Sequence, residues 1–531
     1  MAATDWSFAG VWRGIAEAAP DREAVVCGDR RITFGQLDDR ARRLAWHLAQ
    51  EAELERGDKV AIDLVNCPEY IETFFAALKL GCVPVNVNYR YVADEVHYVV
   101  DNSDAKAVAH GPAFADSVKK ALKRIQKPWR PFTLQTGEAY ENALAAAPPA
   151  TDWQPAHRPS GDELIFLYTG GTTGMPKGVV WRSDDLYVSL WRMGRPGTEP
   201  PDPIAAVTAG KRAGTCLPAC PLMHGTGLFI ALSTLSGGGA VVLIDALGLD
   251  PARVWSEVER NAVEVLTIVG DVFARPLLAA LDAEPNRWNL SSLRAITSSG
   301  VTWSPETKTG LLRHVPQVIL LDSLGASEGM ASRQAATSDD AEIKPARFAV
   351  NDHVRVFRED TGKEVTPGSD EIGLLAVGGR IPLGYWRDPE KTRQTFRVIN
   401  GRRYAVAGDY AQVDADGTIR LLGRGSACIN TGGEKVYPEE VELVLREHAS
   451  VFDCVVVGVP DERFGEIVVA LVQVTENHYL DEPDLAAWCQ AKLAGYKKPR
   501  RFLFVDTLER NAAGKANYRI LRKLAADKLV S

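Results

Sequence analysis

The segment LYTGGTTGMPKGVV, Leu167–Val180, has apolar residues at both ends and glycines, threonines, a proline and a lysine between them. Glycine lets backbone N–H groups face an anion, threonine adds hydroxyl donors, and Lys177 adds a positive charge. This composition predicts a loop that holds phosphate groups, although an ordinary turn with an exposed lysine fits it as well. It is not a Walker A loop, because Pro176 precedes the lysine and Gly178 follows it, where Walker A has Gly and then Ser or Thr.

Segments typical of alternating strands and helices lie on both sides of this loop. Lys59–Val65 has the pattern of a strand, Glu69–Gly81 that of a helix ending at glycine, and Val83–Val87 that of the next strand. Further buried strands that run into Gly or Ser are predicted at Val263–Gly270, Leu293–Gly300 and Val318–Gly329. Strands that end in such loops indicate parallel α/β layers, in which ligands bind beyond the carboxyl ends of the strands.

The sequence changes in character near Arg424, where a short strand leads into a Gly-rich joint. Beyond the joint, helices are predicted at Tyr437–His448 and Asp481–Tyr496, and strands at Asp453–Pro460 and Glu466–Val474. We therefore predict a large α/β domain of residues 1–424 and a small α+β domain of residues 425–531. Residues 195–212, which are rich in Pro, Gly and Ala, are expected to form a mobile loop.

Composition argues against several classes of protein. The 531 residues carry a formal net charge of -8, which is unfavourable for non-specific binding of DNA or RNA. The start of the chain lacks the charged and apolar regions of a signal peptide. The most apolar run, Gly227–Leu249, is interrupted by polar residues and glycines, so we expect a buried helix, turn and strand rather than a membrane span. The eight cysteines are scattered, without zinc-site spacing, and indicate reduced thiols in a cytoplasmic protein.

Further motifs follow the glycine-rich segment along the chain: PLMHGTG (Pro221–Gly227), TSSGVTWS (Thr297–Ser304), DSLGASE (Asp322–Glu328), GLLAVGGRIPLGYWRDPEKTRQTF (Gly373–Phe396), YAVAGDYAQVDADGTIRLLGRGS (Tyr404–Ser426), INTGGEKVYPEEVE (Ile429–Glu442) and RNAAGKANYR (Arg510–Arg519). Together they closely resemble the signatures of the adenylate-forming superfamily of acyl-CoA synthetases, nonribosomal adenylation domains and luciferases. The resemblance covers essentially the whole chain. The segments GGRIPLGYW and GRGSACINTGGEKVYPEE particularly resemble actinobacterial acyl-CoA synthetases, some of which act on steroid-type acids.

This resemblance implies an AMP-forming acyl-CoA ligase that uses ATP, Mg²⁺ and coenzyme A. A carboxylate and ATP would give acyl-AMP and pyrophosphate, and acyl-AMP and the CoA thiol would then give acyl-CoA and AMP. The implied fold has a large α/β domain of layered parallel sheets with helices and a small β-barrel-like subdomain, and a mobile α+β domain follows a hinge. The implied partners are small molecules only, and the oligomeric state, including a homodimer, is left open.

The resemblance also assigns residues to the nucleotide. It gives the β and γ phosphates of ATP to Thr169, Gly170, Gly171, Thr172, Thr173, Gly174 and Lys177. It gives magnesium to Glu328 and the α-phosphate to Ser327, while Asp409 takes the ribose hydroxyls and Arg424 supports the ribose or phosphate. The adenine side is assigned to Gly300, Val301, Thr302, Asp322, Ser323, Leu324 and Gly325.

On the acyl side, His224 borders the pocket and Lys515 bridges the acyl oxygen and the α-phosphate during adenylation. The acyl pocket is assigned to His224, Gly225, Gly270, Ser299, Gly300, Gly325 and Ala326. Many of these residues are small, which favours a medium, long or bulky polycyclic acid. For the second step, the C-terminal domain would rotate about a hinge at Ser426, and Gly432 and Gly433 would leave room for the pantetheine arm.

Two residues on the nucleoside side differ from the superfamily pattern. Leu324 replaces an aromatic residue that usually stacks on adenine, and Ala407 replaces the Thr of the TGD element. Loss of the stacking face would weaken ATP binding by about 1 kcal/mol. An alternative hypothesis is therefore an enzyme with weak adenylation, which mainly converts preformed acyl-adenylate into acyl-CoA.

Three other hypotheses remain at this stage. Gly325–Gly329, GASEG, matches the G-x-S-x-G nucleophile elbow of serine hydrolases, but this would not explain the glycine-rich loop or the GK motif. A ligase that loads an acyl carrier protein would carry the same motifs. A nucleotide-binding module without turnover would also keep them, and substitution of Lys515 or Glu328 would separate that case from an enzyme.

Overall fold

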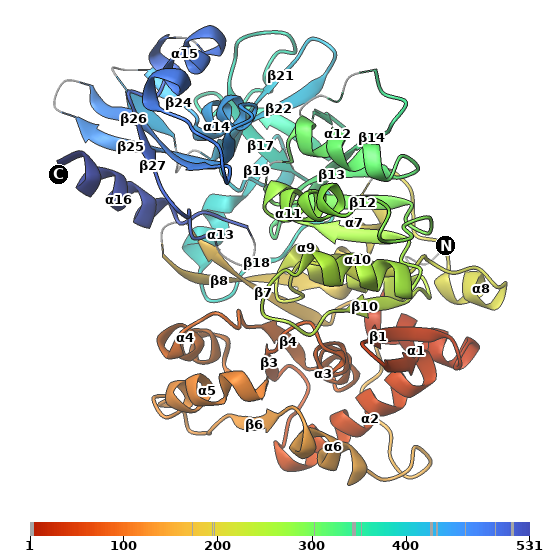
Figure 1. Cartoon of the computed structure of the whole chain (residues 1–531). Coiled ribbons are helices and arrows are strands. Elements are labelled where there is room, and N and C mark those ends of the chain that lie inside the picture. The colour runs from red at the N-terminus through yellow and green to blue at the C-terminus, as the bar shows by residue number, and fades with distance from the viewer. Residues whose placement is uncertain are drawn as a thin grey trace.

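The computed structural model describes residues 5–171, 174–193, 195, 197–301, 303–341, 343, 347–351, 353–424, 428–431, 434–461, 464–493, 495–510 and 514–530. These residues form four sheets, of which two are mainly parallel and belong to the large domain. Figure 1 shows the elements of the small C-terminal domain together at one end of the molecule.

The first sheet has the strand order β14-β13-β12-β11-β9-β10-β1-β2. Its strands are β1 (Glu23–Cys27), β2 (Arg30–Thr33), β9 (Cys216–Pro218), β10 (Val241–Leu243), β11 (Val265–Ile268), β12 (Ala295–Ser299), β13 (Ile319–Ala326) and β14 (Gly329–Ala336). The six inner strands of this order, from β13 to β1, pair in parallel, while β2 and β14 pair antiparallel at the two edges. The carboxyl ends of the parallel strands therefore meet along one edge of the sheet.

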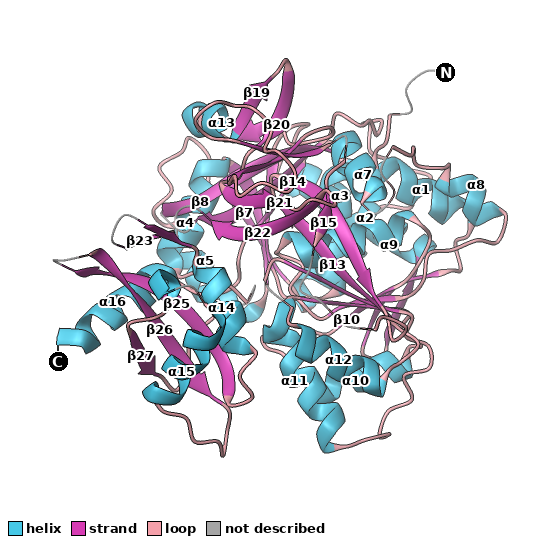
Figure 2. Ribbon diagram, turned by 90° about the horizontal axis from the view of Figure 1, so that it is seen from above, coloured by secondary structure: helices cyan, strands magenta, loops and turns pink. Residues whose placement is uncertain are grey.

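Helices cover both faces of this sheet. One face packs against α10 (Pro251–Arg260), α11 (Gly270–Ala283) and α12 (Pro305–His314), through a core that includes Leu266, Ile296 and Leu320. The other face packs against α1 (Phe8–Ala18), α7 (Ser183–Arg192) and α9 (Gly225–Ser236). Figure 2 shows α10–α12 on one side of β10 and β13, and α7 and α9 on the other.

The second sheet has the order β18-β8-β7-β4-β3-β5-β6. Its strands are β3 (Lys59–Asp63), β4 (Val83–Asn86), β5 (Ala105–His110), β6 (Phe132–Gln135), β7 (Leu164–Gly171), β8 (Gly174–Arg182) and β18 (Gly384–Tyr385). Its helices are α2 (Phe34–Glu51), α3 (Pro68–Lys79), α4 (Ala93–Ser103), η1 (Pro112–Phe114), α5 (Ala115–Leu122) and α6 (Glu138–Ala145). Helices α4 and α5 cover one face, and the other face shares a core with α1, α2, α3 and α9.

The third sheet is antiparallel, with the order β15-β22-β21-β17-β20-β19 and β16 paired to β17. It contains β15 (Phe348–Ala349), β16 (Val354–Phe357), β17 (Gly373–Val377), β19 (Phe396–Ile399), β20 (Arg402–Ala405), β21 (Asp409–Val413) and β22 (Thr418–Arg424), and α13 (Pro389–Thr395) precedes β19. This sheet stands where a barrel-like subdomain was expected, and its described strands follow an open order rather than a closed ring.

The fourth sheet belongs to the C-terminal domain and has the order β24-β23-β26-β25, with β27 paired to β26. Its elements are β23 (Ile429–Thr431), β24 (Glu434–Val436), α14 (Pro438–Arg446), β25 (Val451–Asp461), β26 (Gly465–Val474), α15 (Glu482–Lys492), η3 (Gly495–Lys497), β27 (Arg501–Phe504) and α16 (Tyr518–Val530). Alternate β25 residues pack against α14 and α15 on one face and α16 on the other. This domain has its own core, while the boundary between residues 424 and 425 stays a prediction.

Two expectations need correction. Residues 195–212 are not wholly a loop, because α8 (Pro203–Thr208) forms within them. Asp202 caps this helix by accepting hydrogen bonds from the N–H groups of Ile204 and Ala205, and Pro203 suits the first helical position. The segment around Lys177 is a hairpin rather than a long loop, because β7 continues to Gly171 and β8 starts at Gly174.

The apolar run Gly227–Leu249 is a helix, a turn and a strand, as expected, because α9 and β10 occupy it. Within the part of the chain that the structure describes, no helix has the length and apolar character needed to cross a membrane.

Candidate active site

The hairpin of β7 and β8 presents Lys177 opposite Thr169, and Gly171 lies opposite Gly174. Asn86, at the end of β4, fixes the base of this hairpin. Its side-chain oxygen accepts from the Tyr168 N–H at 2.6 Å, and its amide nitrogen donates to the Tyr168 carbonyl at 3.0 Å. The tip residues Thr172 and Thr173 lie outside the described residues, and Gly170 lies on the described part of β7.

Glu328 lies close to this hairpin. The Tyr385 hydroxyl donates to Glu328 Oε1 at 2.6 Å, and Lys177 Nζ lies 5.8 Å from the centre of the Tyr385 ring. Trp181 of β8 donates to the Ser327 carbonyl at 2.9 Å. The structure therefore brings together Lys177, Ser327 and Glu328, which are far apart in sequence, by packing β8 and β18 against the turn between β13 and β14.

Partial burial lowers the pKa of Lys177. Nearby Lys391 lowers it further, while Asp388 and Glu328 act in the opposite direction. A lysine in this environment gains more from an arriving anion than a fully hydrated lysine does. This is the electrostatic character expected of a phosphate-binding group.

Tyr385 is a site residue to which the sequence analysis gave no role. It is buried in β18, and β18 pairs with β8 through Tyr385 and Val179. Its hydroxyl is therefore held at a fixed distance from the hairpin, so it can orient the Glu328 carboxylate. Tyr385 belongs to the GYW part of a motif that matched the superfamily. Neither the spacing nor the composition of that motif indicated that this hydroxyl contacts a carboxylate.

The donor set fits a magnesium ion that is held mainly by a nucleotide. Among the described residues, no group of three or more His, Cys, Asp or Glu could hold a metal by itself. Magnesium in nucleotide sites is typically bound through one or two carboxylates together with phosphate oxygens and water. The single, partly buried Glu328 carboxylate beside Lys177 matches that pattern.

On the nucleoside side, the structure pairs Asp409 and Arg424 as opposite residues of β21 and β22. The side chain of Arg424 and the whole of Thr302 lie outside the described residues. Gly300 follows β12 with φ +89°, and Val301 comes next. Since a left-handed backbone favours glycine, the turn at the end of β12 depends on this residue.

Asp322 and Leu324 have environments that the sequence did not indicate. The Asp322 carboxylate is buried and accepts a hydrogen bond from Lys308 of α12, so it fixes β13 against that helix. The partly buried side chain of Leu324 packs against the core of the third sheet, a cluster that includes Val354 and Ile419. For Asp322, the backbone rather than the carboxylate therefore remains as a group that a nucleotide could contact.

The residues expected around the acyl group do converge. Gly270 follows β11, Ser299 ends β12, and Gly325 and Ala326 end β13, so all lie at the carboxyl ends of neighbouring parallel strands. The Gly270 N–H donates to Ser298 Oγ at 2.8 Å, which fixes the start of α11 to β12. Gly225 begins α9 directly after His224.

His224 is the N-cap of α9, and its Nε2 is buried without a hydrogen-bond partner among the described residues. Burial lowers its pKa to about 3, and the positive charges of Lys515 and Arg90 act in the same direction. The imidazole is therefore neutral at pH 7. A neutral ring next to a cation can border an uncharged acyl chain without adding a second charge to the site.

Lys515 belongs to the C-terminal domain, yet its positive charge contributes to the lowered pKa of His224. The preceding residue, Gly514, has φ +70°, and a Cβ on it would lie 3.3 Å from Val272 of α11. Gly514 therefore sits in close contact with the start of α11. The structure thus places Lys515 in the vicinity of His224 and the start of α11.

Two arginines that the sequence analysis missed hold this arrangement. Arg510 forms an ion pair with Asp453 at 2.6 Å and donates to the Gly514 carbonyl at 3.1 Å. Arg275 of α11 donates to the Val451 carbonyl of the C-terminal domain at 3.2 Å. The expected hinge residue Ser426 and the expected pantetheine glycines, Gly432 and Gly433, lie outside the described residues.

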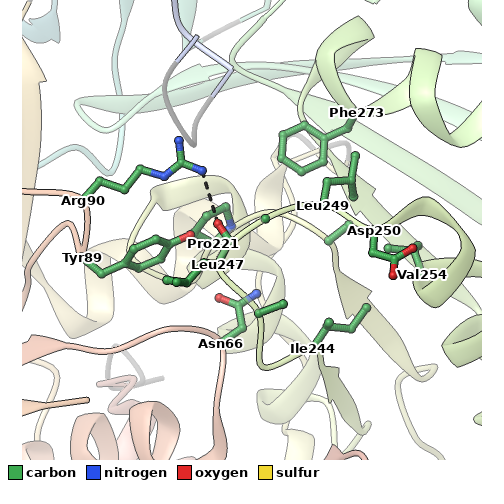
Figure 3. Close-up of a pocket in the computed structure, with 13 residues that line it drawn as sticks. Asn66, Tyr89, Arg90, Pro221, Ile244, Leu247, Leu249, Asp250, Val254 and Phe273 are labelled. Atoms are coloured by element: carbon green, nitrogen blue, oxygen red, sulfur yellow. Dashed lines mark hydrogen bonds between the residues drawn. The ribbon is translucent and has the colours of Figure 1, made fainter. Parts of the chain in front are cut away.

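A cavity lies near this site, beyond the ends of β9 and β10 (Figure 3). Pro221, Leu247, Leu249 and Phe273 contribute to its wall, and Arg90 donates to the Leu247 carbonyl at 3.4 Å. The His224 N–H donates to the carbonyl of Pro221 at 3.2 Å, and Pro221 lines the cavity, so the cavity and His224 are neighbours. None of the residues expected in the acyl pocket is among the described residues that line it.

Comparison with known families identifies the chain. Residues 12–386 match the AMP-binding enzyme family, and residues 440–515 match the AMP-binding enzyme C-terminal domain. The chain belongs to the AMP-binding enzyme family. The first match contains the β7–β8 hairpin, His224 and Glu328, and the second ends at Lys515.

Curated relatives of this family member align over nearly the full length. It is 39% identical, over 95% of this chain and 93% of the relative, to the medium/long-chain-fatty-acid–CoA/3-oxocholest-4-en-26-oate–CoA ligase of Mycobacterium tuberculosis (strain CDC 1551 / Oshkosh). It is 38% identical, with the same coverage, to the 3-oxocholest-4-en-26-oate–CoA ligase of Rhodococcus rhodochrous. The chain is accordingly an acid–thiol ligase of the acyl-CoA synthetase class.

A solved structure has the same fold. The anthranilate CoA ligase AuaEII, in complex with anthranoyl-AMP, superimposes with a TM-score of 0.85 over 99% of this chain and 98% of that chain. At 22% sequence identity, this likeness supports the architecture alone.

Proposed function

We propose that this protein activates a medium, long or bulky polycyclic carboxylic acid with ATP and transfers the acyl group to coenzyme A. The observation that carries the proposal is the meeting of two sets of groups at Asn86, which bonds to Tyr168 of the β7–β8 hairpin and donates to the Met223 carbonyl, directly before His224, at 2.6 Å. Lys177, Glu328 and Tyr385 form the phosphate side, and His224 and Lys515 form the acyl side. The named substrates of the curated relatives, fatty acids and a steroid acid with an oxo group, support the choice of acid.

In the first step, the carboxylate oxygen of the acid would attack the α-phosphorus of ATP, and the bond to pyrophosphate would break. Both reactants are anions, so the protein must position them and reduce their repulsion. Lys177 and Thr169 would hold the phosphates that leave, while Lys515 would contact the attacking carboxylate and the α-phosphate. A magnesium ion held by Glu328 would neutralise phosphate charge, and the Tyr385 hydroxyl would keep that carboxylate in place.

In the second step, the CoA thiolate would attack the acyl carbon, and AMP would leave with the electron pair of the acyl–phosphate bond. Lys515 acts on His224, and Gly514 lies against α11, so we infer that the C-terminal domain must move before the thiol can enter. Asp409 and Arg424 would retain the AMP portion during this change, and we propose Ser426 as its hinge. We place the enzyme in the cytoplasm, where both ATP and CoA are available.

A library of carboxylic acids incubated with the protein, ATP, magnesium and CoA tests this function. Mass spectrometry should find acyl-AMP when CoA is omitted and acyl-CoA when it is present. Pantetheinylated carrier protein in place of CoA tests the other acceptor. Absence of both products across short, long and polycyclic acids would refute the proposal.

Weak adenylation is a second form of this function, favoured by the environment of Leu324. That side chain packs against the third sheet and offers no aromatic face. ATP–pyrophosphate exchange measures the first step alone, and acyl-AMP supplied with CoA measures the second. A slow exchange beside a fast second step would support this form, while comparable rates would exclude it.

A further inference from the structure

Arg333 of β14 is a partly buried cation that no carboxylate neutralises. Its Nε donates to Ser323 Oγ at 3.1 Å, and among the described residues no carboxylate forms an ion pair with it. Burial and the charge of Arg195 together lower its pKa to about 10. A guanidinium has five N–H donors, and this one uses a single donor within the described part of the protein. Burying an unpaired charge is unfavourable, so the remaining donors need an explanation.

The pairing of the strands shows which face of the sheet Arg333 occupies. Ser299 of β12 is opposite Ser323 of β13, and Ser323 is opposite Arg333 of β14. Residues that lie opposite each other in a sheet project from the same face. Arg333 therefore shares a face with Ser299, one of the residues at the expected acyl pocket.

That face is the one covered by α7 and α9. Successive residues alternate between faces, and Ser298 and Asp322 bond to α11 and α12 on the far side. Ser299 and Ser323 must then face the other way, and α7 contacts β14 on that side. His224 begins α9, so the guanidinium and the acyl side of the site share the layer between α9 and the sheet.

A second observation points to the same layer. Thr267 of β11 pairs with Thr297 of β12, which lies on the same face as Ser299. The Oγ1 of Thr267 is buried and has no hydrogen-bond partner in the described residues. The same is true of His224 Nε2. Buried polar groups are rarely left unsatisfied. These two atoms could therefore form hydrogen bonds that the described residues do not supply.

We propose that Arg333, supported by Ser323, binds an oxygen acceptor on the acyl substrate at a distance from the reacting carboxylate. We call this the distal acceptor site, formed by Arg333 and Ser323. Its ligand is a carboxylate or carbonyl oxygen on the tail of the acid, since both accept from a guanidinium. The enzyme then prefers acids with such an oxygen over plain alkyl acids of equal length. The inference rests on the proposed function, because it concerns the acid of that reaction.

The test compares three acids of one chain length: a plain saturated acid, the acid with an oxo group on its tail, and the dicarboxylic acid. For the wild type, kcat/KM should be higher for one or both oxygen-bearing acids. Arg333→Met should lower kcat/KM for the preferred acid by about 10- to 100-fold and change that of the plain acid by less than about threefold, as expected for loss of a charged hydrogen bond. The two oxygen-bearing acids distinguish a carbonyl from an anionic ligand.

Two variants control for folding and for charge. Arg333→Lys keeps the charge with a different donor geometry, and it should keep the preference for the oxygen-bearing acid in weakened form. It serves as the test if Arg333→Met folds poorly. Arg313→Met removes an exposed arginine from α12, on the opposite face, and should leave all three acids unchanged. An equal loss on every acid, or a wild type without preference, would overturn the distal acceptor site. A wild type that forms no acyl-CoA at all would instead refute the proposed function.

Discussion

The phosphate side and the Lys515 side of the site are built in different ways. Lys177 lies on a strand within a sheet, and Glu328 follows a strand of the neighbouring sheet and is held by a side-chain hydrogen bond from Tyr385. Lys515 instead lies in the C-terminal domain, where Arg510 and Arg275 donate to backbone carbonyls. Backbone ladders hold the first region, and a few hydrogen bonds between domains hold the second.

This difference indicates how one site could carry out two steps. A strand pairing breaks only when its sheet unfolds, so the phosphate side should keep its geometry throughout. The contact that Arg275 makes with the C-terminal domain can be exchanged without unfolding either domain, as in other rigid-body transitions. Substitutions in the first region should therefore weaken ATP chemistry directly, whereas substitutions in the second should separate the two half-reactions.

The largest expected effect is that of Lys515→Ala. Loss of a positive charge that contacts two anions should lower the rate of ATP–pyrophosphate exchange by about 100- to 1000-fold. Conversion of supplied acyl-AMP to acyl-CoA should stay within about threefold of the wild type, because Lys515 has to leave the site before that step. Equal losses in both assays would remove the distinction between the two regions.

Tyr385→Phe tests the phosphate side. It removes the hydroxyl that holds Glu328 and keeps the buried ring. A hydrogen bond to a charged group is typically worth about 1.5–3 kcal/mol, so adenylation should fall by about tenfold or more. The loss should diminish when the magnesium concentration is raised, if the hydroxyl acts by orienting the carboxylate. A loss independent of magnesium would indicate a role in packing.

Arg275→Met tests the contact between domains. The Val451 carbonyl loses a donor, which should destabilise the observed orientation of the C-terminal domain. Arg275 also donates to the Arg446 carbonyl at 3.4 Å. Adenylation is expected to fall by about three- to tenfold, the effect of two long hydrogen bonds worth about 1 kcal/mol together, while the second step is unchanged or faster. Arg313→Met on α12 is the matched surface control. A slower second step would contradict the idea that Arg275 favours one orientation.

The sequence predicted the fold best where strands run into small residues. The buried segments around Thr267, Ser299 and Asp322 became β11, β12 and β13, because each is short, apolar and followed by Gly or Ser. The motif residues at the ends of these strands also came together as expected. Parallel pairing explains this success, since it brings equivalent ends of different strands to one edge.

The contacts that hold the site were less predictable. Tyr385, Arg275 and Arg510 act through partners that are 57, 176 and 4 residues away, and several of these partners are backbone carbonyls, which every residue has. Asp322 matched a nucleotide motif, yet its carboxylate is paired with Lys308, because the packing of α12 brings Lys308 to the face of the sheet from which Asp322 projects. Such partners depend on tertiary packing, and a linear pattern does not contain them.

Leu324→Tyr tests the nucleoside side, where the sequence differs from the superfamily pattern. An aromatic ring could stack on adenine and strengthen ATP binding by about 0.5–1.5 kcal/mol, which is roughly a two- to tenfold lower KM for ATP. The thermal midpoint should fall slightly, because the ring must enter a position where leucine packs against the core of the third sheet. An unchanged KM in a folded variant would indicate that adenine does not lie against this residue.

The smallest expected effect concerns His224, whose pKa is lowered by the charge of Lys515 and which we propose borders the acyl group. Its pKa of about 3, caused by burial and by Lys515 and Arg90, means that the ring stays neutral in the folded protein. It should add no inflection to kcat/KM between about pH 5 and 8, and His224→Gln should leave the shape of that profile unchanged.

The pH dependence of stability should reveal this neutral ring. In the unfolded chain the ring takes up a proton below about pH 6.5, so the wild type should lose stability as pH falls through that value, and His224→Gln should lose less. Urea unfolding of both proteins at about pH 7.5 and pH 5 measures this. Equal losses for the two proteins would mean that the ring is accessible to protons in the folded state, as it would be if Lys515 and the C-terminal domain left the site most of the time.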